Sequence, residues 1–289
     1  MALKLATCCQ YCYQRKRTGL SQQEAVPQLR LIYLINLLRA NLLDLEEIKQ
    51  GLSTEKLDTY RQVLDCKNDG ELIAVYMAMQ SIMSHFFPVV QLLEVTLRNS
   101  IHRAATTRFK DDEWYSKIPY TDESKKQVDF AMQQCLNDVG VKYTNNDLIS
   151  RLPFGFWVHM LDKKYNNPRE NDLNLWQTQF DKCFPNAKAN GVSLNTLFQK
   201  LGTFNKFRNR LFHHEPAWKG RKTKDRSDAI KYLHAMYKEH LEVINLLSTS
   251  KRELLGILGF VESFNNECDI KRLDRYTLLL NDNVKVKPE

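Results

Sequence analysis

Long apolar runs are missing from this 289-residue sequence. The longest, at 31–38 and 254–261, fall far short of the roughly 20 apolar residues that cross a bilayer. The first 20 residues carry a basic stretch at 15–17 but no apolar segment followed by small cleavage-site residues, so they do not resemble a secretion signal. We therefore expect a cytoplasmic protein with no membrane span.

Paired cysteines are also missing. Seven cysteines, an odd number, are scattered along the chain, which favours reduced thiols over a disulfide framework. Cys9 and Cys12, beside Cys8, have the spacing of half a zinc site, but the other four cysteines form no second pair that would complete tetrahedral coordination. The sequence thus predicts neither a structural metal nor another cofactor.

Further absences narrow the fold class. The sequence shows no alternation typical of strands, no internal repeat, no glycine-rich phosphate loop and no nucleophile elbow. What is present is a hydrophobic content of 43%, enough for a sizeable core, and 42 basic against 34 acidic residues. The net charge of +8 favours polyanionic partners, and nucleic acid is the polyanion we expect inside a cell.

Helical periodicity dominates the rest of the chain. Apolar residues recur at helical spacing, Ser193 is a favourable N-cap, and Gly51, Gly140 and Pro216 stand where helices should end. Pro88 divides the longest segment into two helices or one kinked helix. We predict an all-α fold with helices at 28–51, 71–109, 123–139, 194–212, 225–247 and onward to 265.

The sequence divides into four parts. A poorly ordered, basic and cysteine-rich start (1–27) and a polar tail (281–289) enclose an N-terminal helical region (28–165) and a C-terminal helical region (173–280). We expect the two helical regions to form one cooperative domain, with the aromatic stretch 152–157 packed against its core. The asparagine-rich segment 165–173 is either the boundary between them or one long surface loop.

The candidate functional site is the segment 206–216, K-F-R-N-R-L-F-H-H-E-P. Three cations and two histidines gather here at the end of a predicted helix. A purely structural interpretation is that the negative end of the helix dipole stabilises these cations. A functional interpretation rests on the order of the residues, because Arg208, Asn209 and His213 form the pattern R-N-x-x-x-H, followed by H-E-P.

This pattern resembles the signature of HEPN-domain ribonucleases. Together with the segments 93–99 (L-E-V-T-L-R-N) and 152–157 (L-P-F-G-F-W), it makes the chain similar to Abi-like proteins of bacterial abortive infection from about residue 80 to 247. The resemblance implies a helical bundle of HEPN type, here with additional helices on the N-terminal side and at the C-terminus. It also implies a metal-independent endoribonuclease that acts as a toxin or phage-defence effector, restrained by an RNA or protein antitoxin.

The residue types fit that chemistry. A ribose 2′-hydroxyl attacks its own phosphodiester when a base takes its proton, an acid protonates the leaving 5′-oxygen and a cation neutralises the phosphate. Histidine transfers protons near neutral pH, and arginine presents a planar fork to phosphate oxygens. We therefore expect His213 to transfer protons, Arg208 to bind the phosphate and Asn209 to orient one of them, with 2′,3′-cyclic phosphate products.

The spacing of the motif constrains its geometry. Asn209 and His213 share one helix face, whereas Arg208 lies about 140° around the axis from His213. Either the helix unwinds before His213, or a second copy of the motif completes the site from another chain. Because HEPN nucleases often pair their motifs across a dimer and this chain has one clear copy, we predict a homodimer with a composite cleft.

A second polar cluster, Glu94, Arg98, Asn99 and His102, lies in the predicted helix upstream. The spacing from Arg98 to His102 is one residue too short for a second catalytic motif. The cluster is either an exposed i,i+4 Glu–Arg pair, contributing about 0.3–0.5 kcal/mol, or a support that packs beside the motif helix and positions it. His214, which points about 100° away from His213, is expected to contact the backbone or the partner chain.

Basic and aromatic residues flank the motif. The loop that follows it is predicted to contact RNA phosphates outside the cleavage site, with a solvated surface loop as the alternative. Trp218 is the aromatic residue expected to stack on bases, and three phenylalanines are expected in the core. The predicted RNA-binding residues are Arg210, Trp218, Lys219, Arg221, Lys222 and Lys224, and the predicted core phenylalanines are Phe204, Phe207 and Phe212.

Two other functions remain open at this point. On the same helical scaffold, Arg208 and His213 could bind RNA phosphates without cutting them. Alternatively, the chain could be a helical protein-interaction scaffold whose positive charge is incidental. Cleavage products with cyclic phosphate ends would distinguish the endoribonuclease from the RNA-binding module and from the interaction scaffold.

Overall fold

A computed structural model describes residues 43–170 and 174–281 of the chain. These residues form helices and no β-strand, apart from an isolated bridge between Asn166 and Asn174. The all-α prediction is therefore confirmed for the described part. The cysteine-rich start, with Cys8, Cys9 and Cys12, lies outside the described residues.

The first half of the described chain contains the long central element, with shorter helices before and after it in the sequence. The prediction of a helix ending near Gly140 is confirmed, because α7 is capped by the Thr121 side chain, and Gly140 follows the helix in the left-handed region with φ 85°. The helices are α3 (Leu45–Gln50), α4 (Thr54–Val63), α5 (Asp69–Ser84), α6 (Phe86–Phe109), η1 (Trp114–Ser116), α7 (Asp122–Asp138), α8 (Asn145–Arg151), α9 (Phe154–His159) and η2 (Lys163–Tyr165).

The second half is helical as far as Asn281. Ser193 accepts a hydrogen bond from the Thr196 N–H at the start of α11, and Asp225 accepts one from the Asp228 N–H at the start of α12, so both predicted helix starts are confirmed. The helices are α10 (Trp176–Cys183), η4 (Lys188–Asn190), α11 (Leu194–Phe212), α12 (Arg226–Leu247), α13 (Thr249–Ile257), α14 (Phe260–Glu267) and α15 (Ile270–Asn281).

One predicted helix is partly wrong. A continuous helix from 28 to 51 is not formed, because Asp44 is extended (φ −89°, ψ 104°) and caps a new helix that begins at Leu45. Its carboxylate accepts hydrogen bonds from the N–H groups of Glu46 and Glu47. A short acidic side chain followed by further acidic residues is a helix start rather than a helix interior. Residues 28–42 lie outside the described part.

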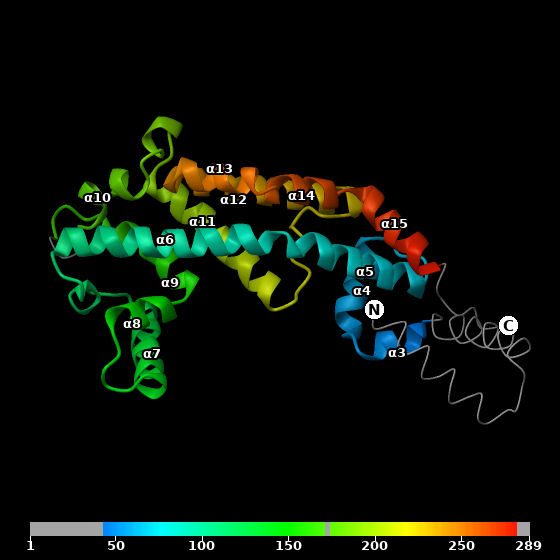
Figure 1. The fold of residues 1–289 in the computed structure, drawn as a ribbon, viewed down its shortest axis with the longest axis horizontal. Coiled ribbons are helices and arrows are strands. Elements are labelled where there is room, and N and C mark those ends of the chain that lie inside the picture. The colour runs from blue at the N-terminus through cyan, green and yellow to red at the C-terminus, as the bar shows by residue number, and fades with distance from the viewer. Residues whose placement is uncertain (1–42, 171–173, 282–289) are drawn as a thin grey trace, which may run out of the picture.

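The long central element is a rod made of α5 and α6 (Figure 1). The chain breaks at His85, so two helices are formed, as one of the two alternatives predicted. Pro88 is the third residue of α6, in the first turn, where its missing N–H costs no hydrogen bond. The rod buries a long apolar series that includes Met79, Ile82 and Phe86.

By length and composition, this rod could also cross a membrane. The span Asp69–Phe109, which contains α5 and α6, has a mean hydropathy of 1.4 in its most apolar window, contrary to the expectation that no stretch qualifies. Of that window, 56% is buried inside the protein. Packing against other helices therefore accounts for much of its apolar surface.

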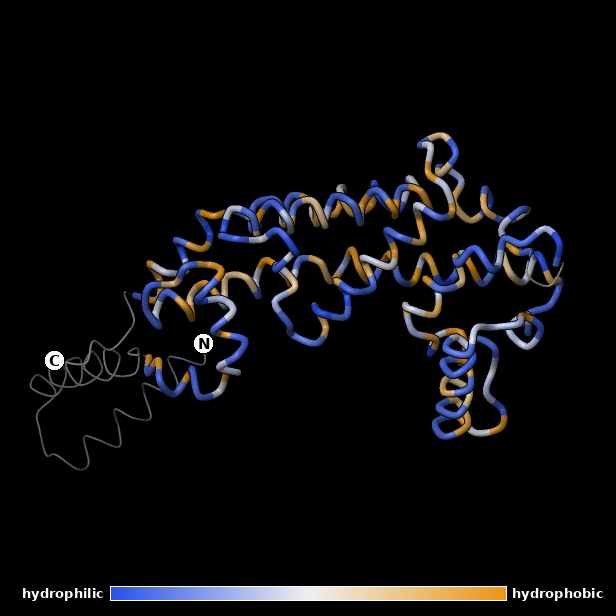
Figure 2. The backbone as a smooth tube through the Cα atoms, turned by 180° about the vertical axis from the view of Figure 1, so that it is seen from behind, coloured by the Kyte–Doolittle hydropathy of each residue, from blue (hydrophilic) through white to orange (hydrophobic). Residues whose placement is uncertain are grey.

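One continuous core joins the two halves of the chain. Its buried residues run from Leu57 to Leu273 and lie on both sides of the asparagine-rich segment 165–173. Figure 2 shows apolar residues recurring along the helices between polar ones. The aromatic stretch packs as predicted, since Phe154, Phe156 and Trp157 are all buried.

Candidate functional site

Helix α11 positions the R-N-x-x-x-H motif. Its buried face carries Leu197, Leu201, Phe204 and Phe207, at the three- and four-residue spacing of an amphipathic helix. The motif begins immediately after this face, so that Arg208 is half-buried while Asn209 and His213 are exposed. In Figure 1, α11 crosses α6, and contacts between Phe207 and Phe86, with ring centroids 4.7 Å apart, hold the two helices together.

The end of α11 is made by the two histidines. His213 is the C-cap, and His214 adopts a left-handed conformation with φ 55°. The His214 N–H donates to the Leu211 carbonyl at 3.2 Å and the Glu215 N–H donates to the Arg210 carbonyl at 2.8 Å, which is the Schellman arrangement. The predicted end of the helix at Phe212 is confirmed, but its predicted cause was wrong, because the left-handed His214 turns the chain before Pro216.

This ending also removes one of the two geometric alternatives. The helix stays regular through Phe212, and the His213 N–H still donates to the Asn209 carbonyl at 2.9 Å. It does not unwind before His213. Within one chain, Arg208 and His213 therefore remain on different sides of α11, and no hydrogen bond joins their side chains among the described residues.

A contact between α6 and α11 fixes the Arg208 guanidinium. Arg208 Nε lies 3.4 Å from Glu94 Oε2, and the two side chains are 31% and 25% exposed. Arg208 Nη1 lies 3.4 Å from Asn209 Oδ1, and the guanidinium carbon lies 4.8 Å from the centre of the Phe212 ring. A guanidinium has five donors, and within residues 43–170 and 174–281 two hydrogen bonds, each of 3.4 Å, are recorded for it, so donors remain for a further acceptor.

The members of the upstream cluster have different hydrogen-bond and ion-pair partners. Glu94 reaches Arg208 instead of pairing with Arg98, so the alternative of an i,i+4 Glu–Arg pair is wrong. Arg98 Nε donates to Asn99 Oδ1 at 3.2 Å, and neither residue is bonded to α11 in the described part of the chain. His102 Nδ1 accepts a hydrogen bond from Trp114 Nε1 at 2.9 Å, and burial lowers the pKa of this histidine.

Arg210 holds the loop after the motif, a contact that its prediction as an RNA-binding residue did not include. Its guanidinium donates to the carbonyls of Pro216 and, at 2.8 Å, of Lys219, and lies 3.7 Å from the Glu215 carboxylate. Its role in RNA binding stays a prediction. The four other cations predicted to contact RNA are all exposed on the loop: Lys219, Arg221, Lys222 and Lys224.

The loop lies close against α12. A Cβ atom added to Gly220 would lie 2.8 Å from the ring of Tyr232, so only glycine fits there without displacement. At the far end of the loop, Arg226 donates to the Leu64 carbonyl at 2.7 Å and pairs with Glu71. The exposed lysines are thus carried on a loop tied down at both ends.

The aromatic predictions were wrong for two residues. Trp218 is fully buried and packs edge-on against Tyr60, with ring centroids 4.9 Å apart, so it cannot stack on a base. Phe212 was expected in the core but is 39% exposed. Phe204 and Phe207 are buried as predicted, around the buried ring of His240, which stacks on Phe204 at 3.9 Å.

One exposed aromatic residue was not predicted at all. Phe87 is 51% exposed, and its ring lies 6.1 Å from that of Phe212 in an edge-to-face arrangement. The sequence holds a signal for it, because Phe86, Val89, Val90 and Leu93 form the buried face of α6 and Phe87 lies off that face. An apolar residue outside the periodic stripe is more exposed than its type suggests.

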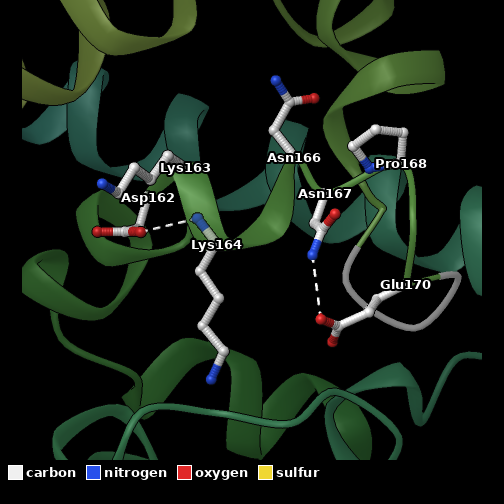
Figure 3. A pocket seen from close by; sticks show the side chains of 7 residues that line it. All are labelled: Asp162, Lys163, Lys164, Asn166, Asn167, Pro168 and Glu170. Carbon is white, nitrogen blue, oxygen red and sulfur yellow. Dashed lines mark hydrogen bonds between the residues drawn. The ribbon is translucent and has the colours of Figure 1, made fainter.

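A shallow hollow lies elsewhere, around η2. Figure 3 shows that it is lined by polar side chains, including Lys164 and Glu170, and its volume is about 450 Å³. Asn167 donates to Glu170 at 3.1 Å within it. None of its lining residues belongs to the R-N-x-x-x-H motif or to the helices that contact it. In the described ranges, no group of three or more His, Cys, Asp and Glu side chains could hold a metal ion.

Comparison with known proteins gives no relative from which a role for these residues could be taken. No family model, curated protein or solved structure matches the chain. The site itself consists of a half-buried arginine, held by a glutamate from another helix, and an exposed asparagine and an exposed histidine near the same helix end.

Proposed function

We propose that this chain is a metal-independent endoribonuclease of HEPN type. The observation that carries the proposal is the contact of Arg208 with Glu94, which holds a guanidinium at the surface beside Asn209 and one turn from His213. An arginine held by a single carboxylate keeps donors for a phosphate, and an exposed imidazole has room to approach the ribose. A surface salt bridge that served stability alone would not require Asn209 and His213 beside it.

In this proposal, Arg208 neutralises the charge that develops on the phosphate. His213 takes the proton of the 2′-hydroxyl or delivers one to the leaving 5′-oxygen, and Asn209 orients the phosphate or the imidazole. The products are a 2′,3′-cyclic phosphate and a 5′-hydroxyl. Because DNA has no 2′-hydroxyl, it is bound but not cut.

The site is completed by a second copy of the chain in this proposal. His213 lies about 140° around the axis of α11 from Arg208, and the helix does not unwind to bring the two side chains together. In a two-fold symmetric dimer, His213 of one protomer and Arg208 of its partner can face the same phosphate. A homodimer with a composite cleft is therefore part of the proposal.

The cellular role follows from the proposed reaction. A nuclease that cuts RNA without a metal cofactor is active in the cytoplasm unless it is restrained. We therefore propose a toxin or phage-defence effector that an RNA or protein antitoxin holds inactive. The exposed loop cations Lys219, Arg221, Lys222 and Lys224 contact phosphates outside the cleavage site.

The experiment that tests the proposal is cleavage of a mixed RNA pool in EDTA, with the product ends analysed. Wild type should yield cyclic phosphate ends, whereas Arg208→Ala and His213→Ala should not. Lys206→Ala, which removes an exposed cation of the same helix, is the matched control and should cut normally. Folded wild type that binds RNA with salt-dependent affinity but never cuts it would instead establish a non-catalytic RNA-binding module.

A further inference from the structure

Two exposed phenylalanine rings lie beside the motif on different helices. Phe87 is the second residue of α6 and Phe212 is the last residue of α11, and 125 positions of sequence separate them. Their rings meet edge to face with centroids 6.1 Å apart. Both rings remain substantially exposed, at 51% and 39%, although 43% of the chain is hydrophobic and a large core is available. Together they form the aromatic patch.

The patch is coupled to the phosphate-binding residue of the proposed site. The guanidinium carbon of Arg208 lies 4.8 Å from the Phe212 ring centre, on the side of the motif. Glu94 contacts Arg208 Nε at 3.4 Å, and the Arg208 side chain is still 31% exposed. The patch therefore presents aromatic surface and a cation together, which suits an anion that carries a flat ring.

We propose that the aromatic patch is a base-stacking subsite for single-stranded RNA, an inference that rests on the proposed function. A nucleobase next to the scissile phosphate stacks on the Phe87 ring, which stands at 72° to the Phe212 ring, while that phosphate meets Arg208. Sequence-tolerant binding of single strands uses this pairing of aromatic faces with cations. It replaces the role that the sequence had suggested for the buried Trp218.

The size of the patch favours a base over a second protein. The two rings together expose about as much area as one complete phenylalanine side chain, roughly 150–250 Å². A stable protein interface needs about 800 Å² on each partner. Along α6, the polar Gln91 separates Phe87 from the next exposed apolar residue, Val95, so the patch does not continue as an apolar stripe.

The position of both rings is fixed before any ligand binds. Phe87 precedes Pro88 in the first turn of α6, where the fixed φ of proline limits the backbone. Phe212 is held between the Phe87 ring and the Arg208 guanidinium. A preordered stacking surface loses little conformational freedom when a base is added, and tighter binding follows.

The test measures binding rather than cleavage, in the full-length His213→Ala chain so that the probe survives. The probes are a labelled 12-nucleotide single-stranded oligouridylate and an abasic ribose-phosphate chain of the same length and charge. The parent should bind the oligouridylate about 5-fold or more tightly than the abasic chain. Phe87→Ala should remove that preference, and Phe212→Trp should keep it. Phe130→Ala, which removes an exposed ring from α7, is the control and should bind both probes as the parent does.

Three outcomes would overturn the inference. The first is a parent chain that binds both probes equally, and the second is a Phe87→Ala variant that keeps the full preference. In the third, Phe87→Ala turns a dimer into a monomer in sedimentation while the preference per chain is unchanged, which would make the patch an interface between copies. Failure of the proposed nuclease is separate, because it appears as absent cleavage by the His213-containing wild type whatever the binding preference.

Discussion

The carboxylate of Glu94 lies 3.4 Å from Nε of Arg208, although 114 residues separate the two in the sequence. This contact joins α6 to the last turns of α11. The guanidinium also contacts Asn209 through Nη1, at 3.4 Å, and the Arg208 side chain stays 31% exposed.

Glu94→Gln should lower cleavage more than it lowers stability. Without the carboxylate, Arg208 samples other rotamers, and we expect kcat to fall about 10-fold because the phosphate is no longer met by a positioned cation. The pair is partly exposed, so the free energy of unfolding should change by less than about 1 kcal/mol. Single-turnover cleavage and urea unfolding measure the two quantities. Asp138→Asn, which breaks the distant Arg151 ion pair, should leave cleavage intact.

The composite site predicts complementation between two inactive variants. Arg208→Ala and His213→Ala chains, each inactive alone, should regain about a quarter of wild-type activity when unfolded together and refolded at equal concentration. Half of the dimers are then mixed, and each mixed dimer contains one intact pair of Arg208 and His213 contributed by different protomers. If the two residues act within one chain, the mixture stays inactive, and the composite cleft is refuted.

His214→Gly should stabilise the protein. His214 has a φ of 55°, a conformation that is strained for a residue with a Cβ atom and relaxed for glycine. We expect the free energy of unfolding to rise by about 1 kcal/mol, with cleavage unchanged because the Schellman hydrogen bonds use only backbone atoms. Gly191→Ala supplies the opposite test, since Gly191 already has a φ of 63° with open space around it, and should be destabilising. Loss of cleavage in His214→Gly would show that the imidazole takes part in the reaction.

The buried His240 should make stability depend on pH. Burial lowers the pKa of this residue to about 4, and its Nδ1 hydrogen bonds the Met236 carbonyl at 2.7 Å. Below pH 6.5 the unfolded chain takes up a proton that the folded chain refuses, so stability present at neutral pH is lost as pH falls toward 4. Between pH 7 and pH 5 the loss should be about 2 kcal/mol.

Replacing the imidazole tests that assignment. His240→Phe should flatten the loss between pH 7 and pH 5 in urea unfolding, whereas His159→Gln, at an exposed position, should leave it unchanged. Asp69 does not account for this pH dependence. Lys49 and Arg61 lower the pKa of its carboxyl, so its contribution to the free energy of unfolding is lost only in more acidic solution. If the free energy of unfolding of His240→Phe fell with pH as steeply as that of wild type, His240 would be excluded as the source of the pH dependence.

Local signals predicted the helices well. Ser193 caps α11, Asp225 caps α12 and Gly140 follows α7, because each of these features depends on hydrogen bonds or dihedral angles within a few residues. The failure at Asp44 has the same origin, since its capping role was hidden inside an apolar periodicity that continues across it. Periodicity finds a helix but does not find a break within it.

Burial of particular aromatic residues was not predictable in the same way. Trp218 stands between Pro216 and a lysine-rich stretch in the sequence, yet the loop folds back and places it against Tyr60. Phe212 falls in an amphipathic helix, but it lies past the end of the buried face. Whether such a ring is buried depends on which distant part of the chain packs over it, and the residues next to it in the sequence do not predict that packing.

The sequence by itself determined the all-helical class, the main helix starts and the presence of R-N-x-x-x-H at a helix end, because caps, periodicity and residue order are local properties. Only the tertiary structure decided that Glu94 holds Arg208, that Arg210 serves the loop and that Phe87 and Phe212 meet at the surface. Those contacts join segments up to 125 residues apart, and packing of whole helices brings such segments together.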